Sequence, residues 1–470
     1  MMPFDIVILW TDALIFVLIA CIVAAGFYIR SQEHLRTSWR RLVENRTGMA
    51  ALTVLLVFVA VGFADSLHYR PAPQVGVWSL LDALLRNLKT HTEKTYSAPF
   101  AVKLDARETV TGPDGAQMRI YPRLVYGGAH LANPDESAAD ILWRARAACV
   151  HAAAGWIVIC AMVVALLACR SRISFAQALG NVLRGETATA WNAALFAVGA
   201  VLLLSVPALE LSSIYHVFGT DKVGNDVFYQ ALKSVRTALV IGTLTTLAML
   251  PLAAVLGILA GYLGGIVDDV VQYVYTTLNS IPGVLLIAAA VLLMQVFIED
   301  HQNWFATAAE RADARLLALC LILGVTSWTG LCRLLRAETL KLRELEYVEA
   351  ARAFGVSHWK IMSRHILPNL MHILLISLVM DFSGLVLAEA VLSYVGIGVD
   401  QNTISFGSMI NTARMELARE PIVWWSLAAA FSFMFTLVLM ANLLSDAVRD
   451  ALDPRMASRV RRAAAAKAGR

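Results

Sequence analysis

The stretch Glu349–Asn369, with the sequence EAARAFGVSHWKIMSRHILPN, decides the fold of this chain. It lies between two long apolar stretches and contains three basic residues, two histidines, a glycine and a proline. Charged side chains are rare and costly inside hydrocarbon. We therefore expect this segment to lie in water between two membrane spans, although its residues are patterned like those of ordered helices.

The rest of the chain has the composition of a membrane protein. Of its 470 residues, 58% are hydrophobic and 16% are charged, whereas soluble domains average roughly 45–50% apolar and about 25% charged residues. The apolar residues collect in runs of about twenty, the length that crosses a ~30 Å hydrocarbon core as a helix. These runs lack the alternation of membrane β-strands. We predict an all-α integral membrane protein, because helices satisfy their own backbone hydrogen bonds in lipid.

We predict about nine transmembrane helices. The first follows a leader without positive charge, and arginines come after its apolar run instead, so we interpret it as an uncleaved anchor and not as a signal peptide. The predicted spans lie near residues 6–28, 48–64, 149–168, 191–209, 237–260, 270–297, 315–332, 371–396 and 423–445.

Lysine and arginine gather in three segments that nine spans place on one side of the membrane. These segments are 30–46, 333–364 and the basic tail 450–470. Short loops rich in these residues stay in the cytoplasm, so we predict an external N-terminus and a cytoplasmic C-terminus. The tail is positioned to touch anionic membrane lipid. No concentrated basic face suggests nucleic-acid binding.

The chain divides into an irregular first half and a compact second half. Residues 1–235 hold four predicted spans and a large external loop, 65–148, which is either a small folded cap or a partly ordered loop. Turn-rich residues at 111–115 and the stretch MRIYPRLVYGG hint at short strands there. Residues 236–449 hold five spans with short connections, among them the polar segment 334–370.

The polar segment is patterned as two short helices with a sharp bend. Leu345, Val348, Ala351 and Phe354 recur at helical spacing. Gly355 suits a left-handed C-terminal cap, and Ser357 suits the N-cap of a second helix, which we expect to end near Pro368. By pattern alone, an interfacial helix that only anchors the loop explains these residues.

The same residues, however, resemble the EAA loop of ABC importer permeases, through Glu349-Ala350-Ala351, Gly355 and Leu367-Pro368. Other segments are similar, in the same order, to permeases of the oligopeptide, dipeptide and nickel branch. These segments are FGTDKVGNDVFYQALKSVRTALVIG (218–242), GYLGG (261–265) with Asp268-Asp269, RHILPN (364–369), EAVLSYVGIG (389–398) and NLLSDAVRDALDPR (442–455).

The resemblance covers about 30–64 and 215–455, and the chain departs from it in places. Asn225 stands where an arginine is usual, and Tyr394-Val395 replaces the usual Phe-Leu. The remaining spans and the external loop are extra to the family's plan of six spans.

The resemblance implies a function and its partners. In this family the polar segment is a coupling loop that sits in a groove of a separate ATPase subunit. We therefore expect a second, similar permease, two ABC ATPase subunits and an extracytoplasmic substrate-binding protein, in a bacterial inner membrane. The expected substrates are peptides, with nickel or another small solute as alternatives. The residues expected to carry the coupling are Glu349, Ala350, Ala351, Arg352, Gly355, Leu367 and Pro368.

Two further groups of residues are candidates for contact with the pathway. Asp381 and Glu389 are acids within an apolar run, where a functional role is the default hypothesis. For Glu389 we favour structure or gating, whereas Asp381 is a candidate for lining the pathway. Gly219, Thr220, Asp221 and Asp226 form a predicted external turn that either faces the binding protein or pathway mouth or is a plain capped turn.

Other classes of function lack their residues. The sequence has no G-x-x-x-x-G-K-[ST] phosphate loop, so we expect ATP hydrolysis only in partner subunits. No catalytic constellation, cofactor motif or metal-type spacing of cysteine and histidine stands out. A membrane enzyme is therefore disfavoured. The main alternative is an ATP-independent secondary transporter or channel, which would need charged relays or inverted repeats.

Overall fold

A computed structural model describes residues 5–31, 33–71, 76–111, 117–305, 307–400 and 403–452. The chain is mostly helical, as the sequence predicts. Within the described residues, seven helices are long and apolar enough to cross a membrane, or eight if one bent pair counts as a single span. The seven are Arg46–Ser66 (α3), Pro134–Ser171 (which contains α6, Ser137–Ser171), Trp191–Ser212 (α8), Val227–Leu263 (α9), Gly283–Asp300 (α11), His358–Val395 (which contains α16, Leu367–Val395) and Trp425–Leu452 (α18).

Three of the predicted spans look different in the structure, so the count of nine is not confirmed. The segment 6–28 forms α1 (Trp10–Ser31), of which the fully described part, Trp10–Cys21, is too short to be counted among the seven. The segment 270–297 is divided into α10 (Gly265–Ser280) and α11 by extended residues at Ile281-Pro282. A residue before proline avoids helical geometry, which explains this break. The segment 315–332 bends by 41° between α12 (Ala308–Ser327) and α13 (Thr329–Arg343).

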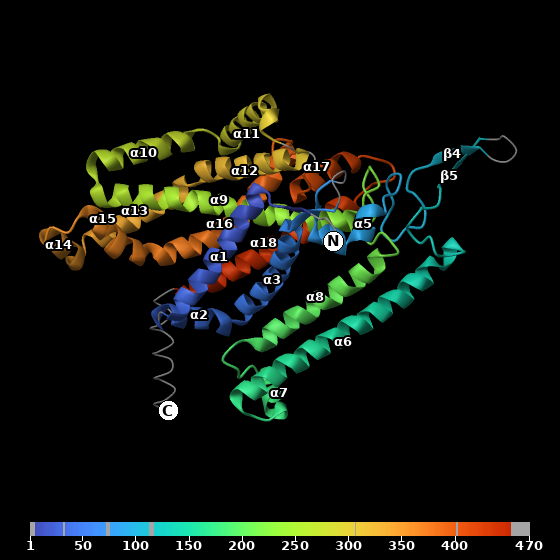
Figure 1. The fold of residues 1–470 in the computed structure, drawn as a ribbon, viewed down its shortest axis with the longest axis horizontal. Helices are drawn as coiled ribbons and strands as arrows, with labels where there is room; N and C mark the ends of the chain where they lie inside the picture. The colour runs from blue at the N-terminus through green and yellow to red at the C-terminus, as the bar shows by residue number, and fades with distance from the viewer. Residues whose placement is uncertain are drawn as a thin grey trace. The chain divides into compact units, whose positions relative to one another are not determined.

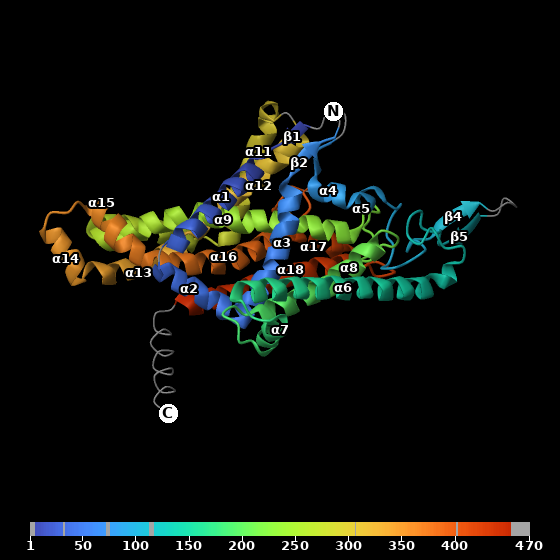
Figure 2. The same cartoon turned by 60° about the horizontal axis from the view of Figure 1, so that its bottom comes forward.

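The chain folds into two compact units (Figures 1 and 2). Of the described residues, unit 1 comprises those within 5–7, 26–237 and 404–451, and unit 2 comprises those within 8–25 and 238–403, together with residue 452. Helix α9 contributes to both units.

A hairpin of two long helices forms much of unit 1. In both views α6 and α8 run side by side, with the short helix α7 (Phe175–Arg184) at one end. Helices α6 and α8 approach closely at Gly199, where an added Cβ would lie 2.8 Å from the indole nitrogen of Trp156. That nitrogen donates a hydrogen bond to the Leu195 carbonyl at 2.8 Å. Unit 1 also contains α2 (Glu33–Glu44), α17 (Phe406–Glu416) and most of α18.

The segment between α3 and α6 is a folded cap, which we define as the described residues of 67–133. Short elements make it up, and its strand β5 lies where the sequence hinted at strands. Residues 112–116, which hold most of the expected turn, lie outside the described residues. The elements are β2 (His68–Arg70), which pairs with β1 (Asp5–Val7) and β3 (Trp78–Ser79), the helices α4 (Leu80–Leu84) and α5 (Arg86–Thr90), and the hairpin of β4 (Glu108–Thr111) and β5 (Gln117–Ile120).

Buried ion pairs join the cap to the start of α9. The Asp82 carboxylate, 2% exposed, receives Lys89 Nζ at 2.6 Å, Lys233 Nζ at 2.9 Å and the Tyr229 hydroxyl at 2.7 Å. Lys233 also lies 3.1 Å from Asp65. Burial alone would raise the pKa of Asp82, but the two lysines and the tyrosine hydroxyl hold it well below its usual range. These buried charges are compensated, so removal of one partner should strongly destabilise the junction.

A second buried cluster surrounds His216. Its Nδ1 lies 2.7 Å from Asp226 and its Nε2 lies 3.6 Å from Glu93. Burial disfavours the charged imidazole, yet these two carboxylates raise the pKa of His216 to about 9. Burial likewise opposes ionisation of Glu93, but His216 and three backbone N–H groups lower the pKa of Glu93 to about 2. The N–H donors belong to Val125, Tyr126 and Gly127.

Unit 2 is built from helices that pack around a continuous apolar cluster. In both figures α9, α13 and α16 run side by side, and α14 (Glu346–Ala353) and α15 (His358–Ile361) lie at one end of them. The cluster extends from Met249 on α9 to Leu370 on α16. This core supports the polar segment that the sequence singles out.

Candidate functional site

The polar segment, residues 334–370, is called the coupling loop below, and α13 leads into it. Two glycines of α9 bring α13 close. A Cβ at Gly257 would lie 2.8 Å from the Cys332 carbonyl oxygen, and a Cβ at Gly261 would lie 2.6 Å from the Thr339 Cβ. Small residues four apart allow two helix backbones to approach in this way. The close packing of α13 against α9 therefore depends on glycine, which has no side chain, at positions 257 and 261.

Charged contacts hold α13 to neighbouring elements of unit 2. The guanidinium of Arg336 forms an ion pair with Asp268 of α10, and its Nη2 lies 2.6 Å from a carboxylate oxygen. Arg343 reaches the Gly261 carbonyl at 3.4 Å, at the end of α9. These partly buried pairs fix α13 where it enters the loop.

Helix α14 ends in the glycine cap that the sequence predicts. Gly355 has φ +73°, in the left-handed region. Its N–H donates to the Arg352 carbonyl at 3.0 Å, and the Val356 N–H donates to the Ala351 carbonyl at 3.1 Å. This pair of bonds is a Schellman motif, which commonly closes helices at glycine. Val356 and Ala351 also pack against the unit 2 cluster, so the bend is ordered and not a loose turn.

The path from α15 into α16 differs from the prediction. Ser357 occupies the N-cap position of α15, but its side chain makes no capping hydrogen bond. The chain then forms a π-helical turn, Met362–Ile366, and continues into α16. The expectation that this helix ends near Pro368 is wrong: the helix continues through Pro368, which directly follows the π-helical turn at the start of α16. One continuous helix therefore runs from His358 to Val395.

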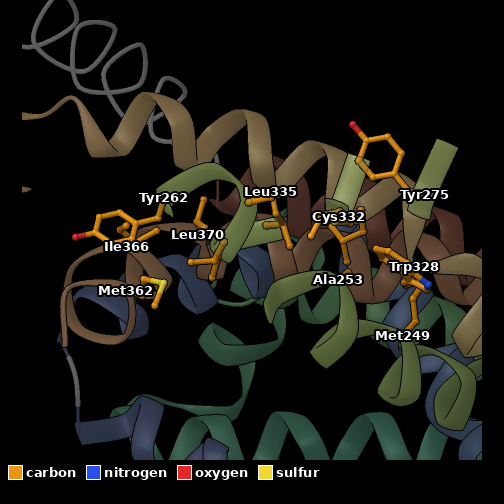
Figure 3. Close-up of a cluster of buried hydrophobic side chains, with 14 of the residues drawn as sticks. Met249, Ala253, Tyr262, Tyr275, Trp328, Cys332, Leu335, Met362, Ile366 and Leu370 are labelled. Carbon is orange, nitrogen blue, oxygen red and sulfur yellow. The ribbon is translucent and has the colours of Figure 1, made fainter. Parts of the chain in front are cut away.

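Buried apolar side chains fasten the coupling loop to the unit 2 cluster. Ile361 and Ile366 are fully buried, and Val348 and Met362 are 2% and 5% exposed. Figure 3 shows Met362 and Ile366 beside Tyr262 and Leu370, with Leu335 and Cys332 further along the same cluster. The Tyr262 hydroxyl also lies 3.1 Å from His358 Nδ1. If the coupling loop moves, the side chains that pack against it in this cluster must therefore move as well.

The opposite face of the coupling loop is open. Phe354 is 86% exposed and Trp359 is 70% exposed, although both are large and apolar. The predicted coupling residues differ in their exposure. Glu349, Ala350, Arg352, Gly355 and Pro368 are exposed, whereas Ala351 and Leu367 are half-buried. A rigid polar platform with protruding aromatic side chains can bind a protein partner.

The predicted turn at 219–226 lies in unit 1 and bonds to its surroundings. Gly219 has φ +67°, and the Thr220 carbonyl accepts a hydrogen bond from the Trp425 indole at 2.9 Å. The Asp221 carboxylate accepts backbone N–H groups of its own turn. Asp226 is fully buried, binds His216 and caps the start of α9 through the Tyr229 N–H. These contacts are those of a structural turn; a role at the pathway mouth stays a prediction.

The two acids in α16 have different surroundings. Glu389 is 1% exposed and accepts a hydrogen bond from the Ser393 hydroxyl at 2.6 Å. Asp381 is half-buried near the middle of the helix. The structure therefore separates the two acids into one that is buried and hydrogen-bonded and one that is only half-buried.

Sequence reasoning missed the residues that seat α13. Gly257 and Gly261 form a G-x-x-x-G pattern, which was a readable signal for close helix packing. The pairing of Arg336 with Asp268 had no such signal, because 68 residues separate the two partners.

Comparison with known proteins gives a consistent result. The family described as binding-protein-dependent transport system inner membrane component matches residues 253–458. The glutathione transport system permease protein GsiD of Pectobacterium atrosepticum is 31% identical over 251 residues, which cover 53% of this chain and 76% of that protein.

Two further relatives are peptide permeases. The oligopeptide transport system permease protein OppC of Mycobacterium bovis is 30% identical over 51% of this chain and 76% of that protein. The dipeptide transport system permease protein DppC of Bacillus subtilis is 28% identical over 51% of this chain and 69% of that protein. With its multiple candidate spans, this chain belongs to the binding-protein-dependent inner-membrane permeases, and it is a multi-pass ABC importer permease of the peptide branch.

Proposed function

We propose that this chain is the membrane-spanning subunit of an ATP-driven importer and that a separate ATPase subunit docks on the open face of its coupling loop. A second, similar permease and a second ATPase subunit complete the complex, and an extracytoplasmic binding protein delivers the solute. ATP hydrolysis takes place in the partner subunits. The turn at 219–226 faces the outside in this arrangement.

One observation carries the docking proposal: the coupling loop is rigid on one face and open on the other. Buried residues such as Ile361 and Ile366 fasten it to α13 and α16. On the other face, Phe354 and Trp359 present apolar area that a folded partner can bury. Glu349 and Arg352 beside them supply charges that orient such a partner.

The same arrangement suggests how ATP drives transport. An ATPase that binds the loop differently in two states shifts the permease between two conformations, since only a difference in affinity can shift an equilibrium. The continuous helix from His358 to Val395 transmits a displacement of the loop into the membrane. A floppy loop would dissipate that displacement, whereas the Schellman motif at Gly355 prevents such bending.

The proposed topology follows from charge. The basic segments 30–46 and 333–364 and the C-terminal tail lie in the cytoplasm, and the N-terminus and the cap lie outside. An outside cap is available to the binding protein, and an inside coupling loop is available to the ATPase.

Small peptides are the proposed solutes. The relatives are named for glutathione, oligopeptide and dipeptide transport. Glutathione is itself a short peptide, so the three names share one class of solute.

The first test is co-purification of the ATPase subunit with this chain in detergent. Wild type is compared with Glu349→Lys, which reverses a charge on the open face, and with Gly355→Pro, which cannot adopt a φ of +73°. Glu186→Lys is the matched control, because Glu186 is exposed in another loop with the same predicted side.

We expect the ATPase to co-purify with wild type and with Glu186→Lys, and to be lost from the two loop variants. Retention of the ATPase by both loop variants would reject the coupling loop as the docking site. Absence of any ATPase from wild type, together with uptake that does not need ATP, would favour a secondary transporter.

A further inference from the structure

Asp381 is a membrane acid for which the described part of the chain supplies no polar partner. It is the fifteenth of the 29 residues of α16, so it lies near the middle of the span. Among the described residues it makes no hydrogen bond and no ion pair, whereas Glu389, eight residues further along, is bound by Ser393. A half-buried carboxylate at this depth is costly, and such residues usually mark a path for polar solutes.

The rotation of α16 about its axis is fixed at this level. Phe382 packs over Gly242 of α9 so closely that a Cβ on that glycine would overlap the ring. Leu385 and Val386 are buried on the same side. Asp381 is displaced from Phe382 by about 100° around the helix. The carboxylate therefore cannot turn into the core without breaking this packing.

Asp381 borders an open stripe on α16. Met380, Leu387 and Val391 are 45%, 43% and 51% exposed, and Gly384 lies among them. A Cβ at Gly384 would meet no atom within 4 Å. The stripe thus leaves free space one turn from the carboxylate. Lipid is a poor occupant of this space, because it would leave the acid without a polar partner in hydrocarbon.

We propose that Asp381 determines specificity by binding a positively charged group, an ammonium or guanidinium, of the transported solute. This inference rests on the proposed importer function and assigns a solute class to the pathway. The carboxylate supplies the charge, Gly384 supplies room, and Met380 supplies a flexible apolar wall that adapts to different solutes. Attraction between the two charges is strong here, because the membrane interior has a low dielectric constant.

The test uses the complete importer in proteoliposomes, with two peptides that differ in one charge. Both peptides have an N-terminus blocked by a formyl group, so that the first, with the sequence Ala-Lys-Ala, carries the lysine ammonium as its only positive charge, and the second carries an acetyl group on the lysine side chain. We expect Asp381→Asn to lower ATP-driven uptake of the lysine peptide about tenfold relative to the acetylated peptide. Asp381→Glu keeps the charge and should keep the preference. Leu387→Asn changes the polarity of the same stripe without removing a charge and should not discriminate between the peptides.

The other outcomes each overturn the inference. Equal loss of both peptides would mean that Asp381 is needed for transport and not for charge recognition. Loss of the second permease from the purified complex would mean that Asp381 pairs with a cation of that subunit. Unchanged uptake would mean that the acid is a neutral structural group. If the wild-type chain recruits no ATPase and shows no ATP-driven uptake, the proposed function itself fails, which co-purification reveals independently of Asp381.

Discussion

The cap and the coupling loop treat their polar and apolar side chains in opposite ways. In the cap, the carboxylate of Asp82 is enclosed and is paired with Lys89 and with Lys233 of α9. In the coupling loop, Glu349 and Arg352 are exposed, and large apolar side chains such as Phe354 stand in the open. The buried charges of the cap have partners within this chain. The coupling loop is packed against unit 2 on one face, and on the other face its large apolar side chains are left exposed.

This difference predicts that some residues of the chain contribute to the stability of the fold and that others contribute to the binding of a partner protein. Changing a residue of the enclosed clusters should alter the free energy of unfolding, because no other group can replace the lost partner. Changing a residue of the open face should alter partner affinity and leave the fold intact. The four predictions below test this separation, in order of expected effect.

The largest effect should follow Lys233→Met. The carboxylates of Asp65 and Asp82 then lose their shared cation, and breaking such a buried pair typically costs about 3–5 kcal/mol. Thermal unfolding in detergent measures the loss. Lys94→Met is the matched control, since its pair with Glu108 is 64% and 33% exposed and should contribute less than about 1 kcal/mol. Equal losses from both variants would contradict the role of the enclosed cluster.

The cap should also lose stability at alkaline pH through His216. The folded-state pKa of about 9 lies above the ordinary 6.5, so the stabilisation is complete below pH 6.5 and is lost as the pH rises through 9. The full loss is on the order of 3 kcal/mol. Glu93 acts in the opposite sense: its folded-state pKa of about 2 gives stability that is complete above pH 4.5 and is lost as the pH falls through 2.

Unfolding curves measured between pH 5 and pH 10 test the histidine. His216→Gln removes the titrating group, so its stability should change much less over the alkaline range. A wild-type curve that is flat above pH 6.5, or a variant with the same slope, would disprove the assignment.

Phe354→Ala should weaken ATPase binding without weakening the fold. The side chain is 86% exposed, so the change in unfolding free energy should stay within about 0.5 kcal/mol. An aromatic side chain that anchors an interface is worth about 2 kcal/mol, or roughly 30-fold in affinity. Titration of the purified ATPase measures the affinity. Phe175→Ala, on the 48% exposed aromatic residue of α7, is the control and should leave the affinity unchanged.

The smallest effect should come from Gly355→Ala. A left-handed residue with a Cβ costs roughly 1–2 kcal/mol, so the thermal midpoint should fall slightly. Gly180→Ala, inside α7 and with no atom within 4 Å of the new Cβ, should instead raise stability by about 0.5–1 kcal/mol. Opposite signs for the two substitutions would confirm that the backbone at Gly355, and not the loss of a glycine as such, matters.

Local signals explain what the sequence could predict. The glycine that follows an amphipathic stretch correctly located the end of α14, because the left-handed cap depends on a few adjacent residues. The apolar runs predicted the helical membrane class, and Pro282 was a local signal for the break at Ile281-Pro282 within the single predicted span 270–297.

Features that depend on distant partners were not predictable. Asp82 and Lys233 are 151 residues apart, and the pattern around either gives no sign of the other. The continuation of the helix through Pro368 was missed for a related reason. A π-helical turn precedes the proline, and packing of Met362 and Ile366 against α9 and α13 accompanies it. The sequence shows which residues these are, but it does not show the tertiary contacts that accompany the π-helical turn.

The π-helical turn at Met362–Ile366 sets the direction in which the side chains of α16 point around the helix axis. A π turn holds one residue more than an α turn, and each residue advances a helix by about 100°. All side chains of α16 therefore point about 100° away from the directions that an uninterrupted α-helix would give them. The direction of the Asp381 side chain is set by this offset, so a one-residue deletion within the turn would rotate that side chain by about 100° around the axis of α16.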